Sequence, residues 1–262
     1  MPITQADLRP VSTLPAACKI CGGISELFDC LDFSRSCEEA RGRFLPRSGV
    51  AVYYRRCTAC GFICTHAFDD WPQALFETFI YNESYLEVDP DFASARPETN
   101  AAWLIRNFSS ARDEIRLLDW GGGNGLLTAK LREAGFPVAE TYDPFTPEFS
   151  AQPTASFNLI TCYETLEHVS DPLATIGAIA ARLADPGVVL FATLLQPEDI
   201  DRLRLRWWYA GPRNGHISLF SRPALVKAWS LSGLRVVSLS EGLHVAFRNL
   251  PQFFPRMSPD KG

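Results

Sequence analysis

The stretch of sequence that decides the fold is Leu117-Leu118-Asp119-Trp120-Gly121-Gly122-Gly123-Asn124-Gly125. An apolar run that begins at Ile115 leads into it, and an amphipathic segment that stops at Gly135 follows it. This order predicts a buried strand over 115–120, a glycine-rich turn, and a helix over 125–134. Small residues at a helix N-terminus let a ligand approach the backbone, so the turn is a candidate ligand loop, with a plain tight turn as the alternative.

The alternation of apolar runs and amphipathic segments continues to residue 247. It predicts strands over 138–142, 157–163 and 188–194, and helices that begin at Pro172 and after Ser221. Two closing strands, over 234–239 and 243–247, are expected to pair antiparallel at the sheet edge, and a further helix is expected over 97–108. Strands that alternate with helices indicate a parallel sheet, so the predicted fold class is α/β and Rossmann-like.

The glycine loop differs from a dinucleotide-binding fingerprint. That fingerprint needs glycine at its first, third and sixth positions, and counting from Gly121 the sixth position is Leu126. An acidic residue, Asp119, also lies inside the preceding strand. A nicotinamide cofactor is therefore disfavoured.

The chain resembles the class I S-adenosyl-L-methionine-dependent methyltransferases over roughly Arg96 to Phe247. The resemblance rests on the glycine loop, on Asp143 at the end of the second strand, and on the run Tyr163-Glu164-Thr165-Leu166-Glu167-His168-Val169-Ser170-Asp171-Pro172. It implies S-adenosyl-L-methionine as cofactor, bound by Asp119, Gly121, Gly123, Gly125, Asp143 and Glu164. In this scheme Asp143 accepts hydrogen bonds from the ribose hydroxyls; an Asp-Pro turn is the alternative for that residue.

The segment after Asp143 departs from the family's pattern. Only 13 residues, 144–156, separate Asp143 from Phe157, where the family has a helix and a further strand. We expect that strand and helix to be truncated or lost. Phe145 and Phe149 are candidates for covering the adenine face by stacking, and patching an exposed core is the alternative for both.

Two matched cysteine pairs lie near the N-terminus, Cys18-Lys19-Ile20-Cys21-Gly22 and Cys57-Thr58-Ala59-Cys60-Gly61. Four thiolates in this spacing are typical of a closed tetrahedral zinc site, so Cys18, Cys21, Cys57 and Cys60 are predicted structural zinc ligands. A redox dithiol and free thiols are the alternatives. We expect a zinc-binding module over 1–65, an aromatic linker and helix over 66–110 that forms a substrate lid, and the cofactor-binding methyltransferase domain over 111–262.

Glu164, Glu167 and His168 follow the third core strand, at the edge of a parallel sheet where ligands bind. Either Glu164 or His168 is a candidate general base, and a framework role is the alternative. Joined by His216 they could instead bind a divalent metal; this arrangement resembles the metal site of small-RNA terminal ribose methyltransferases and, in part, that of ubiquinone-pathway O-methyltransferases. The predicted catalytic residues are His168, Glu164 and His216.

An insert over 202–213 places four arginines among three large aromatic residues. Arginine forks suit phosphates and indole faces suit rings, so Arg204, Arg206, Trp207 and Trp208 are predicted to form one wall of the substrate site. Tyr81, Tyr85 and the turn Asp89-Pro90-Asp91 are predicted to form the opposite wall. A helix with solvated arginines and packed tryptophans is the alternative.

The 262 residues carry 25 Lys and Arg against 30 Asp and Glu, a net charge of −5 that disfavours long nucleic acids. No apolar run is long enough for a membrane span and the N-terminal residues lack a signal-peptide pattern, so we expect a cytoplasmic protein without a membrane partner.

The paired knuckles ahead of a methyltransferase core resemble deoxysugar C-methyltransferases, and this resemblance predicts a small polar acceptor: a sugar or a phosphate-bearing nucleotide-linked sugar. A metal-assisted RNA ribose 2′-O-methyltransferase and a non-catalytic scaffold subunit are the alternatives.

Overall fold

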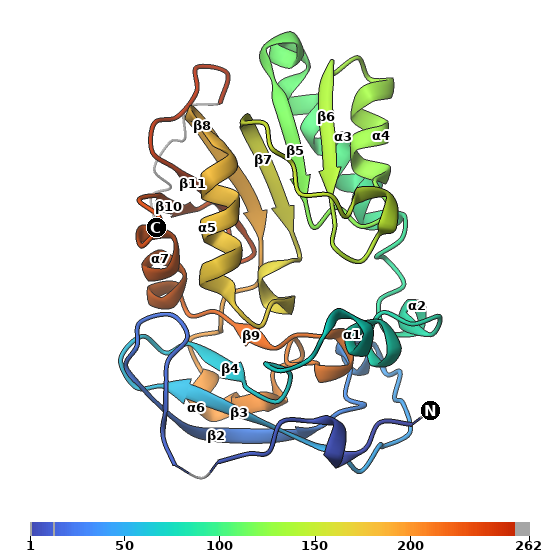
Figure 1. Cartoon of the computed structure of the whole chain (residues 1–262), viewed down its shortest axis with the longest axis vertical. Helices are drawn as coiled ribbons and strands as arrows, with labels where there is room; N and C mark the ends of the chain where they lie inside the picture. The colour runs from blue at the N-terminus through green and yellow to red at the C-terminus, as the bar shows by residue number, and fades with distance from the viewer. Residues whose placement is uncertain (1, 13, 255–262) are drawn as a thin grey trace.

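The computed structural model describes residues 2–12 and 14–254. It consists of a six-stranded sheet flanked by helices and a smaller five-stranded sheet packed beneath it (Figure 1). Within the described residues, no helix combines the length and apolar character needed to cross a bilayer.

The larger sheet has the order β10-β11-β8-β7-β5-β6. Four strands are parallel: β5 (Arg116–Trp120), β6 (Val138–Tyr142), β7 (Phe157–Tyr163) and β8 (Leu183–Ala192). The other two, β10 (Arg235–Ser238) and β11 (Leu243–Phe247), are antiparallel and close one edge. The α/β Rossmann-like prediction is confirmed; β8 starts five residues earlier than the expected 188.

Helices cover both faces of this sheet. They are α3 (Ala95–Phe108) and α4 (Leu126–Glu133) on one face, and α5 (Pro172–Arg182) and α7 (Arg222–Ser230) on the other. Leu117 and Leu159 pack in the cluster with α3 and α4, whereas their neighbours Leu118 and Ile160 pack in the cluster with α5 and α7. Successive side chains of a strand point to opposite faces, and this is why the core strands are apolar without interruption.

The strand predicted to be lost is absent from the described residues. Between β6 and β7 the chain forms only the 3-10 helix η4 (Pro147–Phe149), so β6 is an edge strand of the sheet.

The smaller sheet is antiparallel and combines distant parts of the chain. Its order is β1 (Ala16–Ala17), β2 (Ile24–Asp32), β3 (Ala51–Cys57), β4 (Ile63–Thr65) and β9 (Ser218–Leu219). Since β9 pairs with β4, the C-terminal half of the chain returns to complete the N-terminal sheet. The boundaries 1–65, 66–110 and 111–262 stay a prediction.

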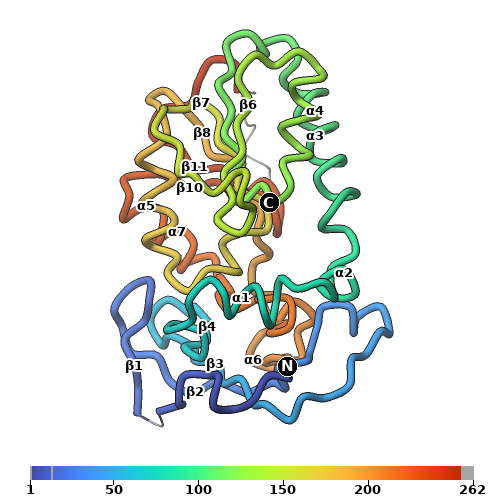
Figure 2. Tube along the Cα trace, turned by 45° about the vertical axis from the view of Figure 1, so that its right-hand side comes forward, coloured from blue at the N-terminus to red at the C-terminus, as the bar shows by residue number. Residues whose placement is uncertain are grey.

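The remaining elements are short, and among them α1 and α2 lie between the two sheets, as Figures 1 and 2 show. They are α1 (Gln73–Phe79), α2 (Tyr85–Val88), α6 (Ile200–Leu203), and the 3-10 helices η1 (Gln5–Asp7), η2 (Cys37–Arg41), η3 (Ser109–Glu114), η5 (Leu166–His168), η6 (Arg204–Arg206) and η7 (Pro212–Asn214).

Candidate active site

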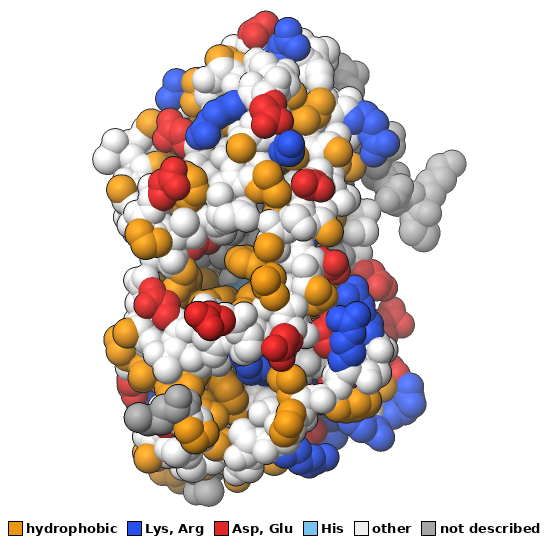
Figure 3. Space-filling view, turned by 90° about the vertical axis from the view of Figure 1, so that its right-hand side faces the viewer, with side chains coloured by type: hydrophobic (Ala, Val, Ile, Leu, Met, Phe, Trp, Pro, Cys, Tyr) orange, Lys and Arg blue, Asp and Glu red, His pale blue; other side chains and the backbone are white. Residues whose placement is uncertain are grey.

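A cleft of about 700 Å³ lies where the carboxyl ends of β5, β6 and β7 meet the smaller half. Figure 3 shows the hollow between the two halves, with hydrophobic and acidic side chains near its rim. The C-terminal edge of a parallel sheet is where such folds bind ligands. Among the predicted site residues, the cleft is lined by Tyr81, Tyr85, Asp119, Gly121, Gly123, Asp143, Glu164 and His168.

The glycine loop forms the floor of the cleft. Gly121 and Gly123 line it with φ of +75° and +54°, in the left-handed region that favours glycine. Asp119 lies buried beneath the loop and accepts a hydrogen bond from Thr161 Oγ1 at 2.6 Å. Burial raises the pKa of Asp119 to about 7. Gly125 does not line the cleft, because the Phe149 ring packs against it.

Asp143 joins the loop to the second strand. Its carboxylate accepts hydrogen bonds from the backbone N–H groups of Gly123, at 2.9 Å, and Phe145, at 2.8 Å. Burial raises the pKa of Asp143, and these two N–H groups oppose the rise. A carboxylate has about four lone-pair sites, so free acceptor positions face the cleft and fit a diol. The Phe145 ring lines the cleft, whereas Phe149 does not.

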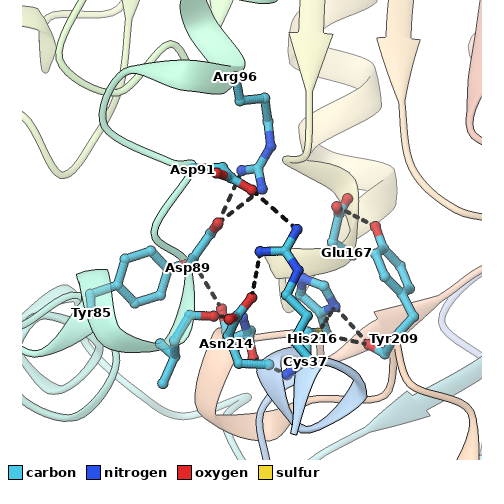
Figure 4. Close-up of polar contacts among 12 residues, drawn as sticks. Cys37, Tyr85, Asp89, Asp91, Arg96, Glu167, Tyr209, Asn214 and His216 are labelled. Atoms are coloured by element: carbon cyan, nitrogen blue, oxygen red, sulfur yellow. Dashed lines mark hydrogen bonds and ion pairs between the residues drawn. The ribbon is translucent and has the colours of Figure 1, made fainter. Parts of the chain in front are cut away.

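Two charged residues, Arg96 and Asp89, lie beside Glu164. Asp89 belongs to the turn predicted for the substrate wall, whereas Arg96 has no predicted role in the site. Arg96 forms a two-pronged ion pair with Asp89, with N–O distances of 2.9 and 3.1 Å (Figure 4). Glu164 has φ of +47°, a strained conformation for a residue with a side chain. Burial raises the pKa of Glu164, and the Arg96 cation opposes the rise. No local pattern marks the pairing of Arg96 with Asp89, because it depends on the fold.

Aromatic side chains form a wall of the cleft that reaches the glycine loop at Phe92. Tyr81 lies with its ring centroid 5.2 Å from Tyr85 and 4.7 Å from Phe145, and Tyr85 lies 5.4 Å from Phe92. The His168 ring is 6.3 Å from Tyr81. Both predicted tyrosines therefore line the same cleft as the glycine loop.

His216 lies beneath His168, with the ring centroids 4.8 Å apart, and is buried outside the cleft lining. Tyr209 contacts both Glu167 and His216. Its hydroxyl donates to Glu167 Oε1 at 2.5 Å, and its carbonyl lies 2.7 Å from His216 Nδ1 (Figure 4). Since a carbonyl only accepts, His216 Nδ1 carries the proton and Nε2 keeps its lone pair. Burial lowers the pKa of His216 to about 4 and that of His168 well below its usual value.

Glu167, His168 and His216 offer ligand atoms that lie within 4.8 Å of one another. Glu167 Oε2 and His168 Nδ1 are buried without a hydrogen-bond partner among the described residues. One carboxylate and two imidazoles form a donor set that catalytic zinc sites use, so these residues fit a divalent metal. Glu164 is not part of this group.

The structure does not bring the insert residues to the cleft. Arg204 is exposed, pairs with Asp29 at 3.2 Å and lies over the Phe28 ring at 4.5 Å. Trp207 is buried in the core of the smaller half, while Arg206 and Trp208 are exposed. The Trp207 indole packs in the core and the Arg204 guanidinium pairs with Asp29, so neither side chain lines the cleft. The role of the insert in substrate binding stays a prediction.

The four cysteines converge as their spacing predicts. The sulfur atoms of Cys18 and Cys60 are 3.7 Å apart, those of Cys21 and Cys57 are 3.5 Å apart, and all four lie within 4.8 Å of one another. Zinc–sulfur bonds of about 2.3 Å give a tetrahedron with edges of roughly 3.8 Å, so the four sulfurs fit zinc.

One of the four thiols ionises more readily than the others. The backbone N–H of Cys60 donates to Cys57 Sγ. Burial opposes ionisation of Cys57, but hydrogen bonds from backbone N–H groups and neighbouring thiols outweigh burial and lower the pKa of Cys57 to about 7. Burial raises the pKa of Cys18 and of Cys60.

Residues 92–239 match the model of the methyltransferase domain family, which covers more than half of the chain. The chain belongs to this family of class I methyltransferases, and it is an S-adenosyl-L-methionine-dependent enzyme.

Curated relatives are named ubiquinone biosynthesis O-methyltransferase. The protein of Xanthomonas oryzae pv. oryzae is 30% identical over 184 residues, which cover 55% of this chain and 73% of the relative. That of Aromatoleum aromaticum is 30% identical over 115 residues, or 35% of this chain, and the chain spans about half (48%) of its length. Among solved structures, magnesium protoporphyrin IX methyltransferase from Synechocystis PCC 6803 is 14% identical, with a TM-score of 0.42 over 70% of this chain and 94% of that chain.

Proposed function

We propose that the enzyme methylates a hydroxyl group of a small, uncharged ring compound, with His168 taking the proton. One observation carries this proposal: the aromatic wall, His168 and the glycine loop line a single cleft. An aromatic wall suits a ring that stacks on it. The names of the curated relatives, O-methyltransferases, support oxygen as the accepting atom.

The chain's residues hold and orient the reactants. When bound, S-adenosyl-L-methionine supplies an electrophilic methyl group. Gly121, Gly123 and Asp143 bind the cofactor at the floor, while Tyr81 and Tyr85 hold the acceptor above it. Most of the rate enhancement comes from this positioning, because methyl transfer needs reacting atoms roughly 3 Å apart and in line. His168 is neutral at pH 7, since burial lowers its pKa, and it can accept the hydroxyl proton.

The charges of the cleft argue against an acceptor with phosphates. Arg96 is the one lysine or arginine among the described residues that line the cleft, and Asp89 already pairs with it. Glu83, Asp89 and Glu164 line the same cleft, and their carboxylates would repel a phosphate. A nucleotide-linked sugar and an RNA terminus are therefore weaker candidates than a neutral phenol or glycoside.

A second candidate is metal-assisted transfer, with a divalent ion on Glu167, His168 and His216. The two partnerless atoms, Glu167 Oε2 and His168 Nδ1, favour it. Such an ion would lower the pKa of the acceptor hydroxyl. We also propose a structural zinc ion on Cys18, Cys21, Cys57 and Cys60, where the sulfur distances fit.

The acceptor proposal is tested by following labelled methyl transfer from S-adenosyl-L-methionine to a dihydroxybenzene, a simple methyl glycoside, a nucleotide-linked sugar and a short RNA. We expect transfer to at least one neutral compound and rates at least about tenfold lower on the charged ones. The His168→Gln variant should lose about 100-fold or more in kcat, while His244→Gln, on β11 and outside the cleft lining, serves as control. Transfer only to the phosphate-bearing compounds contradicts the proposal.

Metal analysis decides between the metal proposals. One zinc per chain, lost in a Cys57→Ser variant, supports the four-cysteine site alone. A second metal that disappears in Glu167→Gln but not in Cys57→Ser supports metal-assisted transfer, and its absence in active enzyme excludes it.

A further inference from the structure

Lys19 lies between the two cysteines of the first knuckle, and its side chain is only 11% exposed. A buried ammonium group is costly unless all its hydrogens are bonded. Here Nζ donates to Asp69 Oδ1 at 2.5 Å, to the carbonyl of Ser170 at 2.9 Å and to the carbonyl of Thr65 at 3.1 Å. An ammonium group has three donors, so every hydrogen of Lys19 has an acceptor.

One of these acceptors belongs to the segment that carries the candidate catalytic residues. Residues 164–170 leave β7, line the cleft at Glu164 and His168, and end at Ser170 before α5. Three backbone carbonyls of this segment accept hydrogen bonds from residues elsewhere in the chain. The Ile217 N–H donates to the Glu167 carbonyl, and the Ser218 hydroxyl donates to the Val169 carbonyl. Lys19 Nζ donates to the Ser170 carbonyl. Lys19 thus joins the cysteine knuckle to this segment across 151 positions of the sequence.

The other end of the link is fixed by the knuckle itself. Cys18 and Cys21, on either side of Lys19, point their sulfurs at Cys60 and Cys57. Asp69 is held in addition by His66 at 2.7 Å and by Arg9 at 3.7 Å, so the carboxylate that anchors Lys19 has little freedom. A change in how the four sulfurs are held shifts the backbone that carries Lys19, and such a shift acts on its contacts with Asp69 and Ser170.

We propose that Lys19 is a positioning residue that couples occupancy of the four-cysteine site to the placement of residues 164–170 in the cleft. The inference rests on the zinc part of the proposed function. With zinc bound, Lys19 holds the Ser170 carbonyl and so the turn that presents His168. Without zinc the knuckle relaxes, this contact weakens, and methyl transfer falls although the cofactor loop is intact.

The test compares Lys19→Met, which keeps the length of the side chain, with Lys227→Met, an exposed lysine on α7, as matched control. Amide hydrogen exchange of residues 164–170, affinity for S-adenosylhomocysteine and zinc content are measured on the full chain. We expect exchange in this segment to rise at least about fivefold in Lys19→Met while affinity and zinc content stay within about twofold. We expect kcat to fall roughly 10- to 100-fold with a smaller change in KM, and Lys19→Arg to recover part of it.

Removing zinc from the wild-type chain should raise exchange in the same segment, whereas removing it from Lys19→Met should add little, because the link is already broken. Additive increases, or exchange and kcat in Lys19→Met equal to those of Lys227→Met, overturn the proposal. If Lys19→Met does not fold, Asp69→Asn applies the same test through the anchor. The exchange readout needs no acceptor, so it stands even where every acceptor tested for the proposed function fails.

Discussion

Alanine at three successive glycines of the cofactor loop separates backbone strain from steric overlap. Gly123 has φ of +54°, and an added Cβ there would meet nothing closer than the Phe92 ring at 3.5 Å. Gly122 lacks a positive φ, but its Cβ would lie 2.5 Å from Asp119 Oδ2. Gly121 combines both, with φ of +75° and a Cβ 2.3 Å from Thr165 Oγ1.

The magnitudes follow from these geometries. A left-handed conformation costs a residue with a Cβ roughly 1–2 kcal/mol, and forcing an atom into packed surroundings costs about 1–3 kcal/mol. We therefore expect losses of unfolding free energy of about 1–2 kcal/mol for Gly123→Ala, about 1–3 kcal/mol for Gly122→Ala, and about 2–5 kcal/mol for Gly121→Ala. Thr165 cannot easily yield, because its hydroxyl is bonded to the Tyr163 carbonyl at 3.0 Å.

Guanidinium titrations of the three variants without cofactor measure these losses. We expect the loss of unfolding free energy to be largest for Gly121→Ala and smallest for Gly123→Ala. The loss for Gly121→Ala should be close to the sum of the losses for the other two variants. A Gly121→Ala variant no less stable than Gly123→Ala refutes the reasoning, since it would mean that the loop and the turn at Thr165 move apart freely.

Three further predictions concern the carboxylates and the cysteines. Asp143→Asn should weaken binding of S-adenosylhomocysteine about 10- to 100-fold by calorimetry, the worth of a hydrogen bond to a charged group, while the exposed Glu140→Gln on the same strand leaves it unchanged. The raised pKa of Asp119, about 7, makes its protonated form the one that favours folding. Lowering the pH from 8 to 5 should therefore stabilise the wild type relative to Asp119→Asn by about 3 kcal/mol, and equal pH profiles in urea titrations contradict this. Cys57→Ser should lose its zinc and melt at lower temperature, whereas the exposed Cys30→Ser should match the wild type in both measurements.

Much of the fold and part of the site are written in local sequence. The strands at 138–142 and 157–163 and the turn at Gly135 follow from apolar periodicity and from conformations that glycine adopts readily. Each CxxC pair sets its own local turn, whereas the pairing of β2 with β3 brings the two turns together. Local residue order acts over a few positions, and the helix period, the strand period and the tight turns are effects of that range.

Tertiary structure alone decided which distant groups meet. Three contacts leave no signal in the local sequence, because each depends on how separate parts of the fold align. They are the ion pair of Arg96 with Asp89, the hydrogen bond from Tyr209 to Glu167, and the hydrogen bond from Lys19 to Ser170. The insert shows the same limit: its composition suggests a substrate wall, yet burial of Trp207 and pairing of Arg204 with Asp29 place it elsewhere. Side-chain destinations follow from competing burial and charge pairing across the whole molecule, whereas secondary structure follows from neighbours along the chain.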